Sequence, residues 1–212
     1  MTSRFVKSNQ APKPFRDWLR DNPRAAAWDD LPTTIKNDLR VQLAKDQQGF
    51  CCYCYTRVNA EMDYPHIEHI EPQDENNRFD WKNLALACEG GNRSRRLTHC
   101  DHAKGEAKLE VVHPYRNPVP RQARLRPNGT LHVPDGKVVE RDINDVLCLN
   151  REHLKQARKN ALTAVMRDLE GTARFNQPWR PRDIESALAS LPPTTPFEPF
   201  LRDWLVRQQG SR

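Results

Sequence analysis

The chain begins with two segments in which apolar residues recur with the period of a helix. In the first, one face carries Phe15, Trp18 and Leu19, and Pro23 ends the segment. The second runs from Pro32 to about residue 48, and its apolar residues stand four positions apart: Ile35, Leu39 and Leu43. A proline suits the first turn of a helix and a glycine suits its end, so we predict two helices before Gly49.

A third apolar pattern predicts the longest helix of the chain, which begins at Asn150 as its N-cap and ends at Gly171. The residues expected on its buried face are Leu154, Ala157, Ala161, Val165 and Leu169. The tail that follows is interrupted by prolines, and its pattern predicts two short helices, around residues 184–191 and 200–206.

Between residues 50 and 114 the helical period disappears and short strand patterns replace it. "HIEHIEP" at 66–72 and "LALAC" at 84–88 are each typical of a short strand. Further on, "RLRPNGTLHV" and "GKVVER" predict strands, with Asn128-Gly129 as a hairpin turn. These patterns together predict an α+β fold, a mainly helical chain around a small core with an extra β-hairpin.

The net charge of the 212 residues is +6, which favours a polyanionic partner such as nucleic acid. The basic residues cluster in "RSRR" at 93–96 and "RQARLR" at 121–126, although either run alone is equally typical of a solvated surface. No apolar run is long enough to span a bilayer, so we predict no membrane association. The N-terminal stretch is polar and broken by prolines, which indicates no secretory signal and predicts a cytoplasmic protein.

The chain contains six cysteines: Cys51, Cys52, Cys54, Cys88, Cys100 and Cys148. In a reducing cytosol, a Cys-x-x-Cys spacing favours metal binding or redox chemistry over disulfides. A thioredoxin-like site would need alternating strands and helices, which the pattern lacks. We therefore predict one structural zinc ion held by four thiolates, from Cys51, Cys54, Cys88 and Cys100. His99 and His102 are rival fourth ligands, and residues 89–99 form a basic insertion between the last two cysteines.

The order of these residues resembles the HNH, or ββα-metal, endonuclease family. The resemblance covers roughly residues 51–105 and runs Cys-x-x-Cys, Glu-His-Ile-x-Pro, Asn-Leu, Cys, and Cys-Asp-x-x-Lys. It implies a core of two short strands and a helix around one catalytic Mg²⁺ or Mn²⁺ ion. It also implies the hydrolysis of phosphodiester bonds in DNA or RNA.

By position in this motif, the resemblance implies that His69 is the general base and that Asn83 braces the loop beside it. Glu68 and Asp101 match the ligands of the catalytic ion, with Asn92 as the alternative to Asp101. We expect four basic residues to contact the nucleic acid: Arg93, Arg95, Arg96 and Lys104.

One difficulty concerns the strand that carries the base. Neighbours in a regular strand point to opposite faces, so Glu68 and His69 reach one site only if the strand twists or bulges. His66 shares the face of Glu68, and we expect it to support the site without binding the ion. Trp81 is expected to pack in the core.

A narrower resemblance extends over most of the chain. The segments "LAKDQQGFCCYC", "LALAC", "HCDHAKG" and "LCLNREHLKQAR" are similar to the small HNH proteins of retrons and of Septu-type anti-phage systems. This resemblance implies an effector of antiviral defence that acts with an ABC-type ATPase as its protein partner. The chain has no phosphate-binding Gly-rich loop of its own.

The expected organisation follows from these assignments. Residues 1–48 form an N-terminal helical segment, 49–115 the HNH core with its zinc site, and 116–212 the hairpin and C-terminal helices, all packed as one unit. Two other interpretations stay open, a zinc-stabilised nucleic-acid-binding module and an assembly subunit without turnover.

Overall fold

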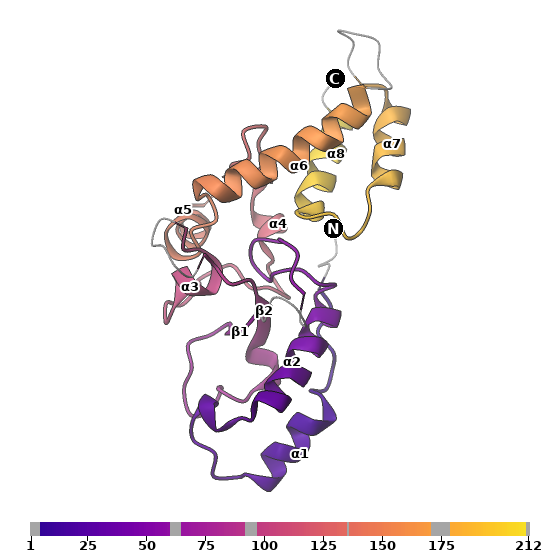
Figure 1. The fold of residues 1–212 in the computed structure, drawn as a ribbon. Helices are drawn as coiled ribbons and strands as arrows, with labels where there is room; N and C mark the ends of the chain where they lie inside the picture. Colours follow the sequence, from indigo (N-terminus) through magenta and orange to yellow (C-terminus); the bar gives the residue numbers. More distant parts are fainter. Residues whose placement is uncertain (1–4, 60–64, 92–96, 135, 171–178, 211–212) are drawn as a thin grey trace.

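The computed structural model describes residues 5–59, 65–91, 97–134, 136–170 and 179–210. In this part of the chain, helices surround two small antiparallel sheets of two strands each. Figure 1 shows an elongated molecule in which the first and last helices lie at opposite ends, with the sheet of β1 and β2 between them. The mixed, helix-rich fold predicted from the sequence is confirmed.

The N-terminal segment forms α1 (Lys13–Asp21), the short helix η1 (Trp28–Asp30) and α2 (Thr33–Asp46). The two longer helices pack against each other, and α2 also packs on both strands of the first sheet. Phe15, Leu39 and Leu43 are buried, as the apolar spacing predicts. Ile35 is only partly buried at the edge of this core.

The first sheet pairs β1 (His66–His69) with β2 (Leu84–Ala87), so that His66 lies opposite Ala87 and His69 opposite Leu84. Every residue of β2 is buried. The short helix η2 (Trp81–Asn83) leads into β2, and Trp81 is buried as predicted. After β2 the chain returns in α3 (Cys100–Lys104), which completes an arrangement of two strands and a helix.

The middle of the chain contains α4 (Val119–Gln122), β3 (Arg124–Leu125), β4 (Leu131–His132), α5 (Lys137–Arg141) and the π-helical turn η3 (Asp142–Val146). The predicted hairpin forms between β3 and β4. The prediction of a strand at "GKVVER" was wrong, because these residues form α5. The Asp142 carboxylate is buried and accepts hydrogen bonds from the backbone N–H groups of Glu110, Val111 and Val112, which anchors the end of this helix.

The C-terminal region is made of α6 (Glu152–Glu170), α7 (Pro181–Ser190) and α8 (Glu198–Gly210), which pack on one another, while α8 also covers β3. The buried face of α6 carries Leu154, Arg158, Leu162, Val165 and Leu169. The predicted Ala157 and Ala161 lie partly buried at its edge. Asn150 is not an N-cap, because its side-chain amide pairs with both backbone groups of Leu131.

The C-terminal region is tied to the segment that carries the first cysteines. The backbone N–H of Phe197 donates to the carbonyl of Tyr55 at 2.9 Å, and the ring of Tyr55 packs edge-on against Phe200. On its other side, Tyr55 stacks on Phe5 at 4.8 Å between ring centroids. The three predicted segments therefore share contacts, while the predicted boundaries between them stay a prediction. None of the helices in the described ranges has both the length and the apolar character needed to cross a membrane.

Candidate metal centres and active site

The four cysteines predicted to bind zinc lie together. The sulfur atoms of Cys51, Cys54, Cys88 and Cys100 are all within 4.8 Å of one another, a group that we call the cysteine cluster. Cys51 and Cys100 are 3.7 Å apart, and Cys54 and Cys88 are also 3.7 Å apart. Cys51 and Cys54 come from the turn after α2, Cys88 follows β2, and Cys100 is the first residue of α3. Four thiols at these distances fit a tetrahedral zinc site.

The backbone beside the cluster requires glycine at two consecutive positions after Cys88. Gly90 and Gly91 both have positive φ angles, +63° and +68°. A Cβ atom on Gly91 would lie 2.3 Å from the carbonyl oxygen of Leu97, and one on Gly90 would lie 2.5 Å from that of His99. The His99 N–H donates to the Gly90 carbonyl at 2.9 Å. The insertion is thus closed at its base by two glycines, and the fourth thiol arrives from α3.

The four thiols of the cysteine cluster change one another's pKa values. Burial raises the pKa of Cys100 well above its ordinary value. Burial acts on Cys54 in the same direction, but hydrogen bonds from the thiols of Cys100 and Cys88 lower its pKa to about 6. A divalent ion would deprotonate all four and leave a net negative charge in the core.

Arg158 is placed to offset that charge. Its side chain is fully buried in α6, and burial lowers its pKa to about 10, while the nearby Cys54 and Cys100 act to raise it. The guanidinium therefore stays protonated at neutral pH. It donates hydrogen bonds to the carbonyls of Gly129 and Leu149, at 2.7 and 2.8 Å.

The rival zinc ligands lie beside the cluster. His99 Nε2 is 3.5 Å from the Cys88 sulfur, and its Nδ1 is 2.7 Å from the Leu97 carbonyl and 3.2 Å from His153. His102 belongs to a different group. The four sulfurs are the donor atoms that converge, and His99 lies at hydrogen-bonding distance from one of them.

A second group of possible metal ligands begins at the next residue of α3. The donor atoms of His66, Asp101 and His102 lie within 4.8 Å of one another, and we call them the His–Asp–His cluster. His66 Nδ1 is 3.0 Å from Asp101 Oδ2, and this hydrogen bond raises the pKa of His66. The rings of His66 and His102 are 4.5 Å apart. The other carboxylate oxygen of Asp101 is buried and has no hydrogen-bond partner among the described residues.

Glu68 lies in a buried pair with Lys104. Its Oε1 accepts a hydrogen bond from the Tyr53 hydroxyl at 2.7 Å and is 3.0 Å from the Lys104 ammonium, whose side chain is 1 % exposed. Burial raises the pKa of Glu68 to about 7. Lys104 also donates to the His69 carbonyl at 2.9 Å. The structure therefore uses Lys104, expected from the sequence to contact nucleic acid, to hold α3 against β1.

His69 lies on the opposite face of β1, as strand geometry requires. Its Nε2 is 2.9 Å from the Arg78 carbonyl, which can only accept, so Nε2 carries the proton and Nδ1 keeps its lone pair. Its ring packs edge-on against Trp28 at 4.7 Å. Burial lowers the pKa of His69, so the ring is neutral at pH 7.

Asn83 fixes the residues that directly follow His69, the last residue of β1. Its Oδ1 accepts from the Glu71 N–H at 2.8 Å, and its amide donates to the Glu71 carbonyl at 3.1 Å. The Ile70 N–H donates to the Asn83 carbonyl at 2.9 Å. Three hydrogen bonds thus join η2 to the residues that directly follow the histidine.

Some residues predicted for the site lie outside the described residues: Asn92, Arg93, Arg95 and Arg96.

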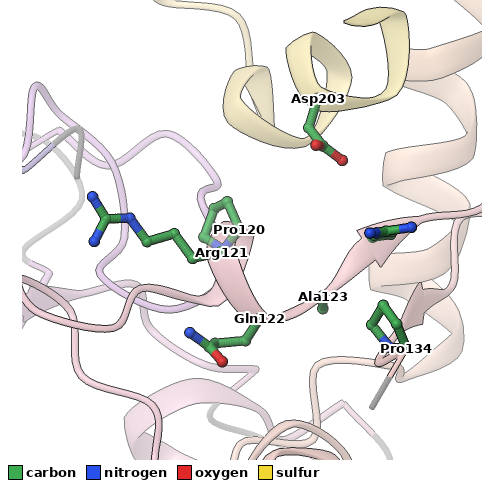
Figure 2. A pocket seen from close by; sticks show the side chains of 7 residues that line it. Pro120, Arg121, Gln122, Ala123, Pro134 and Asp203 are labelled. Carbon is green, nitrogen blue, oxygen red and sulfur yellow. The ribbon is translucent and has the colours of Figure 1, made fainter. Parts of the chain in front are cut away.

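The second basic run, residues 121–126, lies within the described residues. Part of this run borders an open pocket of about 490 Å³ between α4, β3 and α8. Figure 2 shows Arg121 and Gln122 on one side of this pocket and the carboxylate of Asp203 on α8 across from them. The pocket is lined by Pro120, Arg121, Gln122, Ala123, Arg124, Pro134 and Asp203.

Three features of the site were not found from the sequence. His66 was expected only to support the site, whereas in the structure it lies beside Asp101 and His102. Its position on the same strand face as Glu68 was the signal that could have indicated this. Trp28 gives no local signal, because it lies far from the motif along the chain. Arg158 stands four residues after Leu154 on the apolar face of a helix, and a charged residue at such a position indicates a buried partner.

The comparison with known protein families agrees with this geometry. Residues 51–96 match the family model described as HNH endonuclease. The matched segment contains both strands of the first sheet, His69, Asn83 and three of the four clustered cysteines, and it ends before α3. No curated protein matches the chain.

Proposed function

We propose that this chain is a metal-dependent endonuclease of the HNH type that hydrolyses phosphodiester bonds in nucleic acid. A nuclease function is supported in general by the family match over residues 51–96. The observation that carries the finer proposal is the state of His69, a neutral imidazole whose Nδ1 is free to accept a proton. General base catalysis of this kind contributes about 10²- to 10⁴-fold to a rate.

In the proposed reaction, a water molecule loses its proton to Nδ1 of His69 as its oxygen attacks the phosphorus. The bond from phosphorus to the leaving sugar oxygen breaks, and that oxygen takes a proton from solvent. The Arg78 carbonyl holds the opposite nitrogen and so fixes the tautomer. Asn83 keeps the following loop in place, and Trp28 covers one side of the imidazole. The protein thereby orients the base before substrate arrives.

Two kinds of metal fit the donor atoms present. Zinc suits the cysteine cluster, where it would bind α3 to the turn after α2 and to the end of β2. A divalent ion beside Asp101 would supply positive charge for a bound phosphate and the departing oxygen. The orphaned oxygen of Asp101 supports this placement. Because the side chain of His69 lies on the opposite face of β1, the phosphate would have to span the end of the strand to reach both groups.

The resemblance to retron and Septu proteins extends the proposal to a biological role. It supports a cytoplasmic effector of anti-phage defence that acts with an ABC-type ATPase. Phage infection of cells that carry the chain and the ATPase would test this part, and a His69→Ala chain that protects as well as wild type would exclude defence by cleavage.

The enzymatic proposal is tested by incubating the purified chain with plasmid DNA, single-stranded DNA and tRNA, each with Mg²⁺ or Mn²⁺. We expect His69→Ala to lose at least about 10²-fold of the cleavage rate. His132→Ala, at a half-buried position on β4, is the matched control and should cleave as wild type does. If His69→Ala cleaves as fast as wild type, the proposed base is wrong. If both bind nucleic acid and neither cleaves it, the chain is a binding module.

A further inference from the structure

We propose that the divalent ion of this site is a transition-metal ion bound by His66, Asp101 and His102, and that Glu68 is not one of its ligands. The inference rests on the proposed function for its biological meaning, but ion binding can be measured without cleavage. It replaces the ligand pair expected from the sequence, Glu68 and Asp101, with a set that contains two imidazoles.

The first argument is convergence. β1 contributes His66, and the first turn of α3 contributes Asp101 and His102. Their donor atoms lie within 4.8 Å of one another, close enough for one ion to bind all three. The His66 side chain is 37 % exposed and His102 is partly exposed, so solvent reaches the cluster.

The second argument concerns protons and lone pairs. His102 Nδ1 is 3.1 Å from the Glu89 carbonyl, which accepts only, so Nδ1 carries the hydrogen and Nε2 keeps a lone pair. When a histidine binds a metal ion through one ring nitrogen, the other ring nitrogen usually donates its hydrogen to a carbonyl or carboxylate. Asp101 adds a buried carboxylate oxygen without a partner in the described chain. A bound cation would satisfy that oxygen, which is costly to bury alone.

The third argument removes Glu68 from the ligand set. Its Oε1 already has the Tyr53 hydroxyl at 2.7 Å and the Lys104 ammonium at 3.0 Å. An ion bound there would face a buried ammonium group, and displacing Lys104 would leave that charge in the core without its partner. Glu68 acts instead as the anchor of Lys104, and Lys104 fixes the helix that presents Asp101.

The donor set then predicts which ion is bound. Mg²⁺ prefers oxygen ligands and keeps most of its water, whereas imidazole nitrogen suits Co²⁺, Ni²⁺ and Zn²⁺, and affinity for a site of nitrogen and oxygen donors rises from Mn²⁺ to Co²⁺ and Ni²⁺. Three protein donors leave open positions for water and for a phosphate oxygen, which is typical of a catalytic site. We therefore expect the site to bind Mn²⁺ and Co²⁺ more tightly than Mg²⁺.

The test uses the full chain with zinc already bound, titrated calorimetrically with Mn²⁺, Co²⁺ or Mg²⁺. We expect one Mn²⁺ or Co²⁺ per chain in addition to zinc, with affinity reduced at least about 10-fold in His66→Ala and in His102→Ala. Glu68→Gln keeps a side chain that can accept from Tyr53 and Lys104, and it should bind within about 3-fold of wild type. His132→Ala is the matched control for loss of a histidine elsewhere. Weaker binding in Glu68→Gln with unchanged binding in His66→Ala would overturn the inference.

A spectroscopic readout covers the case in which a variant fails to fold. Pulsed electron paramagnetic resonance of Mn²⁺ bound to the wild-type chain should detect coupling to histidine nitrogen, and ¹⁵N-histidine labelling should change that coupling. A signal from oxygen ligands alone, or no bound ion at all, would overturn the inference. Nitrogen coupling in a chain that cuts no substrate would uphold the ligands and refute the nuclease. If cleavage needs His69 and Mg²⁺ but bound Mn²⁺ shows no nitrogen coupling, the nuclease would be upheld and the proposed ligands refuted.

Discussion

The cysteine cluster and the His–Asp–His cluster meet at two consecutive residues of one short helix, Cys100 and Asp101. Cys51, Cys54 and Cys100 have no exposed surface, whereas the His66 side chain is 37 % exposed. The first cluster offers four soft sulfur donors, and the second offers two nitrogens and a carboxylate. The difference separates a closed group of donors, typical of a structural site, from an open group that solvent can reach.

The two clusters also differ in the charged groups that lie near them. The thiols have a buried counter-charge in Arg158, which comes from the C-terminal helix α6. The second cluster has an unsatisfied Asp101 oxygen and no buried cation of this kind within it. The thiols thus have a buried, permanent cation nearby, whereas Asp101 has the partly exposed His66 as its ion-pair partner.

The largest expected effect comes from removing one sulfur. Cys100→Ser should lose the zinc and its cooperative unfolding transition, because structural zinc contributes about 10–16 kcal/mol of binding free energy to folded small domains. Metal analysis and thermal melting monitored by circular dichroism measure this. Cys148→Ser, outside the cluster, is the control and should keep both properties. Zinc retained in full by Cys100→Ser would mean that a neighbouring histidine is the fourth ligand.

An intermediate effect is expected from the buried pair that joins the two clusters. Lys104→Met should lower the free energy of unfolding by about 3–5 kcal/mol, because it leaves Glu68 buried without its cation. Urea unfolding with zinc present measures this loss, and adding Glu68→Gln should recover part of it.

The matched control for that pair is a surface ion pair. Lys108 lies 3.2 Å from Glu71, and both side chains are largely exposed, so Lys108→Met should cost at most about 1 kcal/mol. Equal losses in the Lys104 and Lys108 variants would show that Lys104 is not held as described. The role of Glu68 as an anchor would then fail.

Much of the fold follows from periodicity, and much of the site follows from spacing. Leu39 and Leu43 predicted a buried helix face, and the order of the four cysteines predicted their convergence. The strand predicted at "GKVVER" failed because Asp142 is fixed by backbone groups thirty or so residues earlier, at 110–112, a contact that no local pattern reveals. Helix α6 was predicted with two alanines on its buried face, but Arg158 occupies that face.

From the sequence, the site could be predicted only for residues that stand close together in the motif. The spacing of His69 and Asn83 matches the family motif, and the structure joins Asn83 to the residues that directly follow His69. The partner of Glu68 could not be read, because Lys104 reaches it from another element 36 positions on. Trp28 contacts His69 from outside the motif altogether.

The smallest expected effect is a change in stability with pH that comes from His113, a residue outside both clusters. Burial lowers the pKa of His113 to about 4, and its Nδ1 accepts from the N–H groups of Tyr115 and Arg116. The stability that this neutral ring provides is complete above pH 6.5. It is lost as the pH falls from 6.5 toward 4, because the unfolded chain binds the proton first.

We expect that loss to be on the order of 1 kcal/mol, since the ring is partly exposed to solvent. Urea unfolding at pH 7.5 and 5.5 should show a smaller difference for His113→Gln than for wild type. The same difference in both proteins would show that His113 contributes nothing to the acid sensitivity.

The closed base of the segment between Cys88 and Cys100 has a consequence for how the protein can change. Its two ends are joined by the bond from His99 to Gly90 and by the shared cysteine cluster, so its length does not set the position of α3. Lengthening a loop costs only about 0.6 kcal/mol for each doubling. A target-binding domain could therefore be inserted between Cys88 and Cys100 while the two clusters keep their positions, and it would give the chain a new binding specificity.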